Sequence, residues 1–170
     1  PDYAVTVYTR ILKRLYPHVP VVIGGIEASL RRLTHYDYWS DSLKPSVLVD
    51  SGADLLMYGM GERVVPQVVR AMRNGFNAKL LRKIRQVAFL ADREYVDRLD
   101  PEHTLHLSSY EECLGDKRAF GRNFVEEETL SNMAEPETTL VERTGDRYVV
   151  VTPPNATLAT EELDRSFDLP

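Results

Sequence analysis

Two short stretches decide the fold of this chain, Val21-Val22-Ile23-Gly24-Gly25 and Asp54-Leu55-Leu56-Met57-Tyr58-Gly59-Met60-Gly61-Glu62. Each is an apolar run that ends in glycine, and such uninterrupted runs are typical of strands covered on both faces, as in a parallel sheet. The sequence between them predicts a helix over residues 26–33, followed by a polar-aromatic loop over residues 34–39. Together they predict a βαβ unit whose two glycine loops share one edge of the sheet.

The flanking segments extend this α/β pattern. Apolar side chains recur at helical spacing from Ala4 to Leu15, and Pro17 ends that helix. A second apolar stripe over residues 64–72 predicts a helix after the second strand, with Gly75 at its C-terminal cap. Residues 87–90 predict a third strand. We therefore expect residues 1–92 to form an α/β core, a partial doubly wound, Rossmann-like parallel sheet.

Residues 93–170 predict a helical and β-hairpin extension of this core. Ser109 and Glu112 form a capping box at the start of a helix that reaches about Leu130, with the run Glu126-Glu127-Glu128 on its solvated face. Two strands, over residues 139–143 and 147–151, flank a three-residue hairpin loop. Thr160 begins a last short helix.

The composition is that of an ordinary globular domain, with 43% apolar and 28% charged residues among 170. The single cysteine, Cys113, excludes a disulfide framework and any three-cysteine cluster within these residues, and we expect it to pack as a small apolar side chain. The four histidines show no metal-ligand spacing. No apolar run approaches the roughly 20 residues of a membrane span, so we expect a cytoplasmic location. Because the chain begins at Pro1 without methionine and ends on Asp168-Leu169-Pro170, we expect it to be a piece of a longer protein.

The charge is unevenly distributed along the chain. Residues 1–85 carry 13 Lys and Arg against 7 Asp and Glu, whereas residues 86–170 carry 8 against 19. One interpretation is that these charges lie on solvated helix faces. The other is that the basic half meets an anion such as a phosphate, a carboxylate or RNA.

The glycine loops are the strongest candidates for a ligand site, because backbone N–H groups at strand ends can approach an anion closely. The alternative is that the glycines only permit tight turns. A dinucleotide fingerprint fails because Val64 stands where a third glycine is needed, and no Gly-Lys-Ser/Thr sequence follows either loop. The candidate ligand residues are Gly24, Gly25, Glu27, Ser29, Arg31, Arg32, Gly59, Gly61 and Glu62.

The charged candidates each have two interpretations. Glu62 is either a favourable acid in the first turn of a helix or a hydrogen-bond acceptor for a ligand. Arg31 and Arg32 either form ion pairs with nearby aspartates or contact an anion or RNA together with His35 and Tyr36. The aspartates within reach are Asp37, Asp41 and Asp50.

Four blocks of the sequence resemble YgiQ-type radical SAM proteins: residues 21–32, residues 54–62, residues 146–154, and residues 161–164 with the ending 168–170. The resemblance implies an N-terminal domain that precedes a radical SAM barrel. That barrel would hold a 4Fe–4S cluster and S-adenosylmethionine and form a 5′-deoxyadenosyl radical that acts on an unknown substrate. Its Cys-x3-Cys-x2-Cys loop would begin beyond Pro170, so we expect no catalytic residue and no cofactor within this chain.

The glycine loops also resemble the cobalamin-binding-like domains that precede some radical SAM barrels. The Asp-x-His-x-x-Gly signature of a histidine-ligated cobalamin is missing from the sequence. The resemblance therefore implies a shared α/β scaffold rather than cobalamin itself.

Two functional hypotheses follow. In the first, this chain is an accessory domain that packs on the barrel of the same protein and helps bind substrate or an anion, being inactive alone. In the second, it binds RNA or another anion without catalysis, although a net charge of −5 counts against this. We also expect some self-association, because an unpaired sheet edge can pair between chains. The basic residues of the second hypothesis are Arg31, Arg32, Arg63, Arg70, Arg73, Lys79, Arg82 and Lys83.

Overall fold

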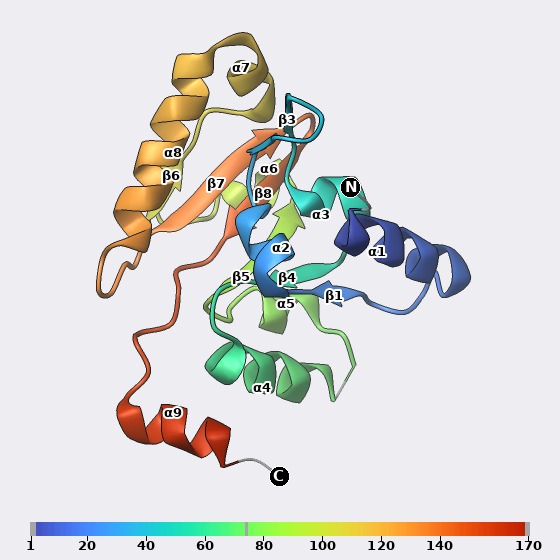
Figure 1. Ribbon diagram of the computed structural model, residues 1–170, viewed down its shortest axis with the longest axis vertical. Coiled ribbons are helices and arrows are strands. Elements are labelled where there is room, and N and C mark those ends of the chain that lie inside the picture. Colours follow the sequence, from blue (N-terminus) through green and yellow to red (C-terminus); the bar gives the residue numbers. More distant parts are fainter. Residues whose placement is uncertain (1–2, 74, 169–170) are drawn as a thin grey trace.

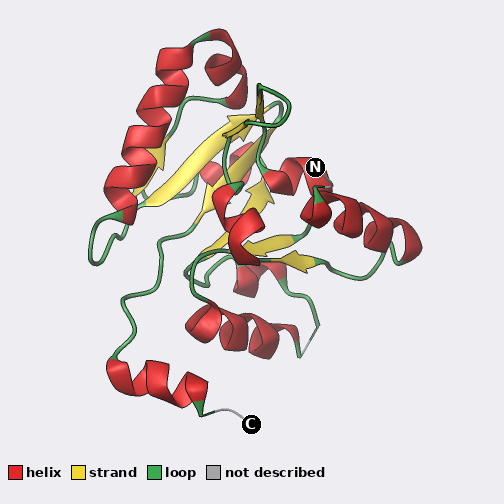
Figure 2. Cartoon of the chain, in the orientation of Figure 1, coloured by secondary structure: helices red, strands yellow, loops and turns green. Residues whose placement is uncertain are grey.

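The computed structural model describes residues 3–73 and 75–168, so Pro1 and the last two residues of the predicted ending lie outside the described residues. A six-stranded sheet in the order β1-β4-β5-β8-β7-β6 lies at the centre, with helices on both sides (Figures 1 and 2). A separate hairpin pairs β2 with β3. The strands are β1 (Val22–Ile23), β2 (His35–Asp37), β3 (Ser42–Lys44), β4 (Leu55–Met57), β5 (Val87–Ala91), β6 (Thr104–His106), β7 (Thr139–Thr144) and β8 (Arg147–Val151).

Two apolar cores, one on each face of the sheet, hold the helices in place. Because successive side chains of a strand point to opposite faces, Ala88 packs in one core while Val87 and Phe89 pack in the other. The first core lies under α1 (Ala4–Leu15), α2 (Gly25–Leu30), α3 (Val47–Ser51) and α8 (Lys117–Ser131). The second core lies under α4 (Gly61–Met72), α5 (Ala78–Leu81) and α6 (Arg93–Val96).

Three elements complete the chain. A 3-10 turn (Pro101–His103) precedes β6, and α7 (Tyr110–Gly115) precedes α8. At the C-terminal end, α9 (Thr160–Phe167) follows an extended segment (Figure 1). None of the helices in the described ranges is long and apolar enough to cross a membrane.

The predicted α/β class is confirmed, and so is the central βαβ unit. β1 and β4 are parallel neighbours, with Val22 opposite Leu55 and Ile23 opposite Leu56. The expectation of a parallel sheet for residues 1–92 needs correction, because its third strand, β5, pairs antiparallel with β4. The expected hairpin is present as β7–β8, and β8 pairs antiparallel with β5. The connection from β4 to β5 contains two helices, α4 and α5. It returns the chain to the carboxyl end of β4, where β5 begins. Hydrophobic periodicity does not reveal strand direction, so the sequence did not indicate this.

The sheet takes three strands from residues 1–92 and three from residues 93–170, because the hairpin β7–β8 continues from β5. The two predicted parts, residues 1–92 and 93–170, thus contribute strands to the same sheet. A domain boundary at residue 92 stays a prediction.

Three local expectations are also corrected. Residues 34–39 contain the strand β2 rather than only loop. The helix expected from Ser109 to about Leu130 breaks at Asp116, whose extended backbone ends α7 and whose carboxylate caps α8 by accepting from Arg118 N–H. The β7–β8 hairpin has a two-residue turn, since Thr144 pairs directly with Arg147.

Candidate functional site

The two glycine loops meet at the carboxyl ends of β1 and β4. The N–H of Gly59 donates to Ser29 Oγ (3.1 Å), which ties the second loop to α2. A Cβ added to Gly24 would lie 3.3 Å from the carbonyl oxygen of Met57, so the first loop passes close to the end of β4. The structure thus brings Gly24, Ser29 and Gly59 together.

Two of these glycines adopt a backbone that favours glycine. Gly25 has a φ of +81° and Gly59 a φ of +66°, both in the left-handed region. Gly61 begins α4, and Glu62 follows it as an exposed residue of the first turn. Glu62 has no hydrogen-bond or ion-pair partner among the described residues, which fits its interpretation as a first-turn acid.

Gln86 locks the second loop in place, and sequence reasoning missed it. It is buried, with a φ of 67° that non-glycine residues rarely adopt. Its Nε2 donates to the carbonyl oxygens of Tyr58 (2.6 Å) and Met60, and its Oε1 accepts from Asn155 N–H (3.2 Å) and Nδ2 (3.0 Å). This one side chain joins the Gly59 loop to the segment that follows β8.

Arg32 and Tyr58 form the next layer of the site. The guanidinium carbon of Arg32 lies 5.0 Å from the centre of the Tyr58 ring, and its terminal nitrogens bind Glu127 (2.6 Å) and the carbonyl oxygen of Ser29 (2.7 Å). Tyr58 Oη donates to the carbonyl oxygen of Thr152 (2.5 Å), and burial raises the pKa of its hydroxyl. Arg32 therefore already neutralises a carboxylate, and a bound anion would have to compete with it.

The Glu127 partner corrects the expectation that residues 126–128 form only a solvated face. Glu127, a residue of α8, is half-buried against Arg32. Burial raises the pKa of its carboxyl, and the charge of Arg32 opposes that shift.

Two cavities, of about 280 and 270 Å³, lie beside the Gly59 loop. Tyr58, Gly59, Ser131, Pro136 and Pro154 line both of them. Ser29 and Arg32 line the first cavity, whereas the predicted residues other than these two and Gly59 line neither. The walls thus come largely from residues 127–158, in which sequence reasoning placed no site residue.

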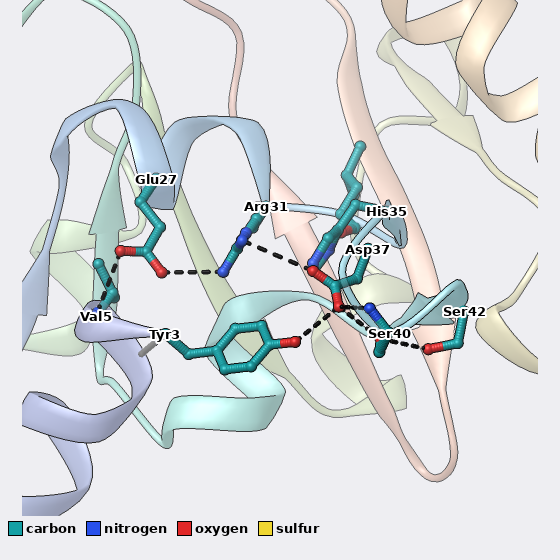
Figure 3. Close-up of polar contacts among 9 residues, drawn as sticks. Tyr3, Val5, Glu27, Arg31, His35, Asp37, Ser40 and Ser42 are labelled. Atoms are coloured by element: carbon teal, nitrogen blue, oxygen red, sulfur yellow. Dashed lines mark hydrogen bonds and ion pairs between the residues drawn. The ribbon is translucent and has the colours of Figure 1, made fainter. Parts of the chain in front are cut away.

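Arg31 and Glu27 lie elsewhere, in a polar network that joins the N-terminal segment to α2 and β2 (Figure 3). Arg31 binds Glu27 (2.9 Å) and lies 3.9 Å from Asp37, which matches its interpretation as an ion-pair residue. Tyr3 Oη donates to Asp37 (2.7 Å). Hydrogen bonds from Ser40 and then from Tyr3 lower the pKa of Asp37 to about 2. This network is consistent with a structural role.

Comparison with known proteins gives one family and several relatives. The family model described as Radical SAM N-terminal matches residues 1–170. Proteins named UPF0313 are similar to the whole chain: 50% identical in Porphyromonas gingivalis, 44% in Bacteroides thetaiotaomicron and 41% in Thermotoga maritima. The chain covers 26%, 29% and 29% of these relatives, so it spans little more than a quarter of their length. No solved structure matches the chain significantly.

Proposed function

Because this chain belongs to the Radical SAM N-terminal family, we propose that it is an accessory domain that packs against a radical SAM barrel of the same protein. The observation that carries this proposal is the meeting of two glycine loops at one edge of the sheet, with two cavities beside them. Ligands of open α/β sheets bind at such an edge. In this proposal, which we call the division of labour, the domain helps to bind the substrate and the barrel carries out the reaction of S-adenosylmethionine.

The chain's own residues do not fit the 4Fe–4S cluster that the family description implies. Such a cluster is held by several cysteine thiolates, whereas Cys113 is the only cysteine in the sequence. Cys113 is buried, and burial raises the pKa of its thiol to about 11, so it stays protonated. We therefore assign the cluster and S-adenosylmethionine to the proposed barrel.

Exposed apolar side chains beside the glycine loops support packing against another body. Ile26, next to the first loop, is 80% exposed, and Met60, within the second, is 57% exposed. Large apolar side chains that flank a polar site are typical of an interface. The cavity of about 280 Å³ beside the Gly59 loop is lined by Ser131 and Thr138, whose hydroxyl groups would meet a polar part of the substrate.

No observation favours the RNA hypothesis, which stays a prediction. Of its eight basic residues, Arg31, Arg32 and Arg63 bind carboxylates within the fold. Arg82 lies over the rings of Phe89 and Tyr95.

The division of labour is tested by comparing residues 1–170 with the protein at its full natural length. After anaerobic reconstitution with iron and sulfide, we expect the full-length protein to show cluster absorbance and to convert S-adenosylmethionine to 5′-deoxyadenosine. Residues 1–170 alone should do neither. An intact cluster in residues 1–170, or a full-length protein that binds a cluster but never cleaves S-adenosylmethionine, would refute the proposal.

Hydrogen–deuterium exchange on the same two proteins tests the packing. Residues 24–30 and 58–62 should exchange more slowly in the full-length protein, because the barrel would cover them. The turn at residues 145–146, far along the β7–β8 hairpin, serves as an internal control. Equal exchange at the glycine loops in both proteins would rule out packing at this edge.

A further inference from the structure

A third cavity, of about 630 Å³, lies between α8, β7 and the connection from α2 to β2. It is more than twice as large as either cavity beside the Gly59 loop. Leu33, Leu107 and Phe120 form apolar parts of its wall. Leu30 and Phe124 also line it and are 71% and 55% exposed, so apolar surface continues to its mouth. Such a cavity suits a ligand with an apolar body.

A buried carboxylate, that of Glu142, lines the same cavity. Glu142 lies two residues after Leu140 on β7, so it points to the same face of the sheet as that core residue, and it is only 1% exposed. Its Oε1 accepts from the N–H (2.9 Å) and Oγ1 (2.8 Å) of Thr34. Among the described residues no Lys or Arg pairs with it. A buried carboxyl without a cation is costly in its charged form, so burial raises the pKa of Glu142 to about 7.

The charged groups around Glu142 leave this cavity without a free cation. Glu127 and Glu128 line it from α8, and the paired Arg32 from the α2–β2 connection already neutralises Glu127. His35, on the same connection, has its imidazole pKa lowered by burial and stays neutral. From α7, the charge of Glu111 further raises the pKa of Glu142, whereas Cys113, whose own pKa is raised by burial, stays protonated and uncharged. The cavity therefore has an excess of negative charge.

We propose that this cavity binds a small organic amine: a single ammonium group attached to an aromatic or aliphatic body. The ammonium would form an ion pair with Glu142. It would thus supply the cation that this buried carboxylate lacks. The body would pack between Phe120 and Phe124, which line the cavity. An anion would meet repulsion from Glu128 and Glu142, and a neutral alcohol would gain only a hydrogen bond.

The proposal differs from a purely structural role for Glu142, in which the carboxyl only anchors Thr34. Glutamine at position 142 can still accept both hydrogen bonds from Thr34, because its carbonyl oxygen takes the place of Oε1. It cannot form an ion pair. The variant Glu142→Gln thus separates anchoring from cation binding, independently of the radical SAM assignment.

The test is isothermal titration calorimetry on the protein at its full natural length, at pH 7, with three probes of similar size. We expect 4-phenylbutylamine to bind at least about tenfold more tightly than 4-phenylbutanol, and 4-phenylbutyrate to bind most weakly. Titration in buffers of different ionisation enthalpy should show proton release on amine binding, because burial raises the pKa of Glu142 and its protonated fraction loses the proton when the ion pair forms. This release is measured on the unmodified protein and needs no variant.

The variants locate the site. Glu142→Gln should lower the amine affinity to that of the alcohol and abolish proton release. Phe124→Ala should weaken the amine and the alcohol equally. The matched control is Glu126→Gln, an exposed residue of α8 outside the cavity lining, which should change nothing.

Equal affinity for the three probes, no measurable amine binding, or amine binding without proton release would overturn the proposal. So would unchanged amine affinity in a folded Glu142→Gln protein. If that variant does not fold, the proton release of the unmodified protein and the effect of Phe124→Ala decide the question.

Discussion

Gly59 and Gln86 lie side by side at the carboxyl end of β4. Gly59 has a φ of +66°, and a Cβ there would lie 3.4 Å from Gln86 Nε2. Gln86 itself has a φ of 67°, a conformation that costs about 1–3 kcal/mol in a residue other than glycine. The four hydrogen bonds of its side chain offset that cost. The conformation of the candidate site thus depends on these two residues.

Replacing Gly59 tests this directly. Gly59→Ala should destabilise the chain by about 1–2 kcal/mol, because alanine is strained in the left-handed region. The matched control, Gly121→Ala, lies at an exposed position inside α8 where an added Cβ meets nothing within 4 Å. It should instead stabilise the chain by about 0.5–1 kcal/mol, as alanine does in a helix. Urea unfolding measures both, and effects of the same sign would contradict the assignment.

Single site residues could be predicted from the sequence where the backbone conformation allows few residue types. Gly25 and Gly59 were identifiable, because few other residues adopt their φ. Gln86 was not, because no pattern in its neighbourhood indicates a left-handed residue. Glu142 could have been found: it shares the strand face of Leu140, and a polar residue in such a register indicates a buried polar group.

The break between α7 and α8 rests on helix capping at both starts. Ser109 Oγ accepts from Glu112 N–H (3.2 Å), and Glu112 accepts from Ser109 N–H (2.7 Å), so the predicted capping box is confirmed. Asp116 caps α8 through a single bond, in which its Oδ1 accepts from Arg118 N–H (2.9 Å). The two helices form separate units, because each has its own N-terminal cap.

Ser109→Ala should destabilise the chain by about 1 kcal/mol, since it removes the acceptor at the start of α7. Ser108→Ala is the matched control, because the Ser108 contacts to Asn123 use only its backbone N–H and carbonyl oxygen. Its effect should stay within about 0.5 kcal/mol. Equal losses in thermal unfolding experiments would contradict a capping role.

Whole elements were predictable where local signals were strong. The periodic helices α1 and α4, the strands β1 and β4 and the β7–β8 hairpin all emerged from apolar spacing and glycine positions. The β2–β3 hairpin did not, because its polar and aromatic residues carry no alternation. Strand direction depends on long-range pairing, which is why the antiparallel β5 was not foreseen.

Over the whole molecule, ion pairs join the basic and the acidic half of the chain. Arg32 binds Glu127, Arg63 binds Glu162 on α9, and Arg85 binds Glu137 (2.7 Å). These ion pairs thus partly neutralise, in the folded chain, the uneven charge along the sequence. Self-association through the edge strand β1, whose described partner is β4 alone, stays a prediction that light scattering at high concentration can test.

The parallel pairing of β1 with β4 places both glycine loops at one edge of the sheet, and the proposed function starts from it. Interstrand nuclear Overhauser effects measured by NMR on isotope-labelled residues 1–170 test that pairing most directly. We predict contacts that place Ile23 beside Leu56 and Val22 beside Leu55, in the pattern of parallel strands. Antiparallel contacts, or Ile23 beside any strand other than β4, would contradict the account.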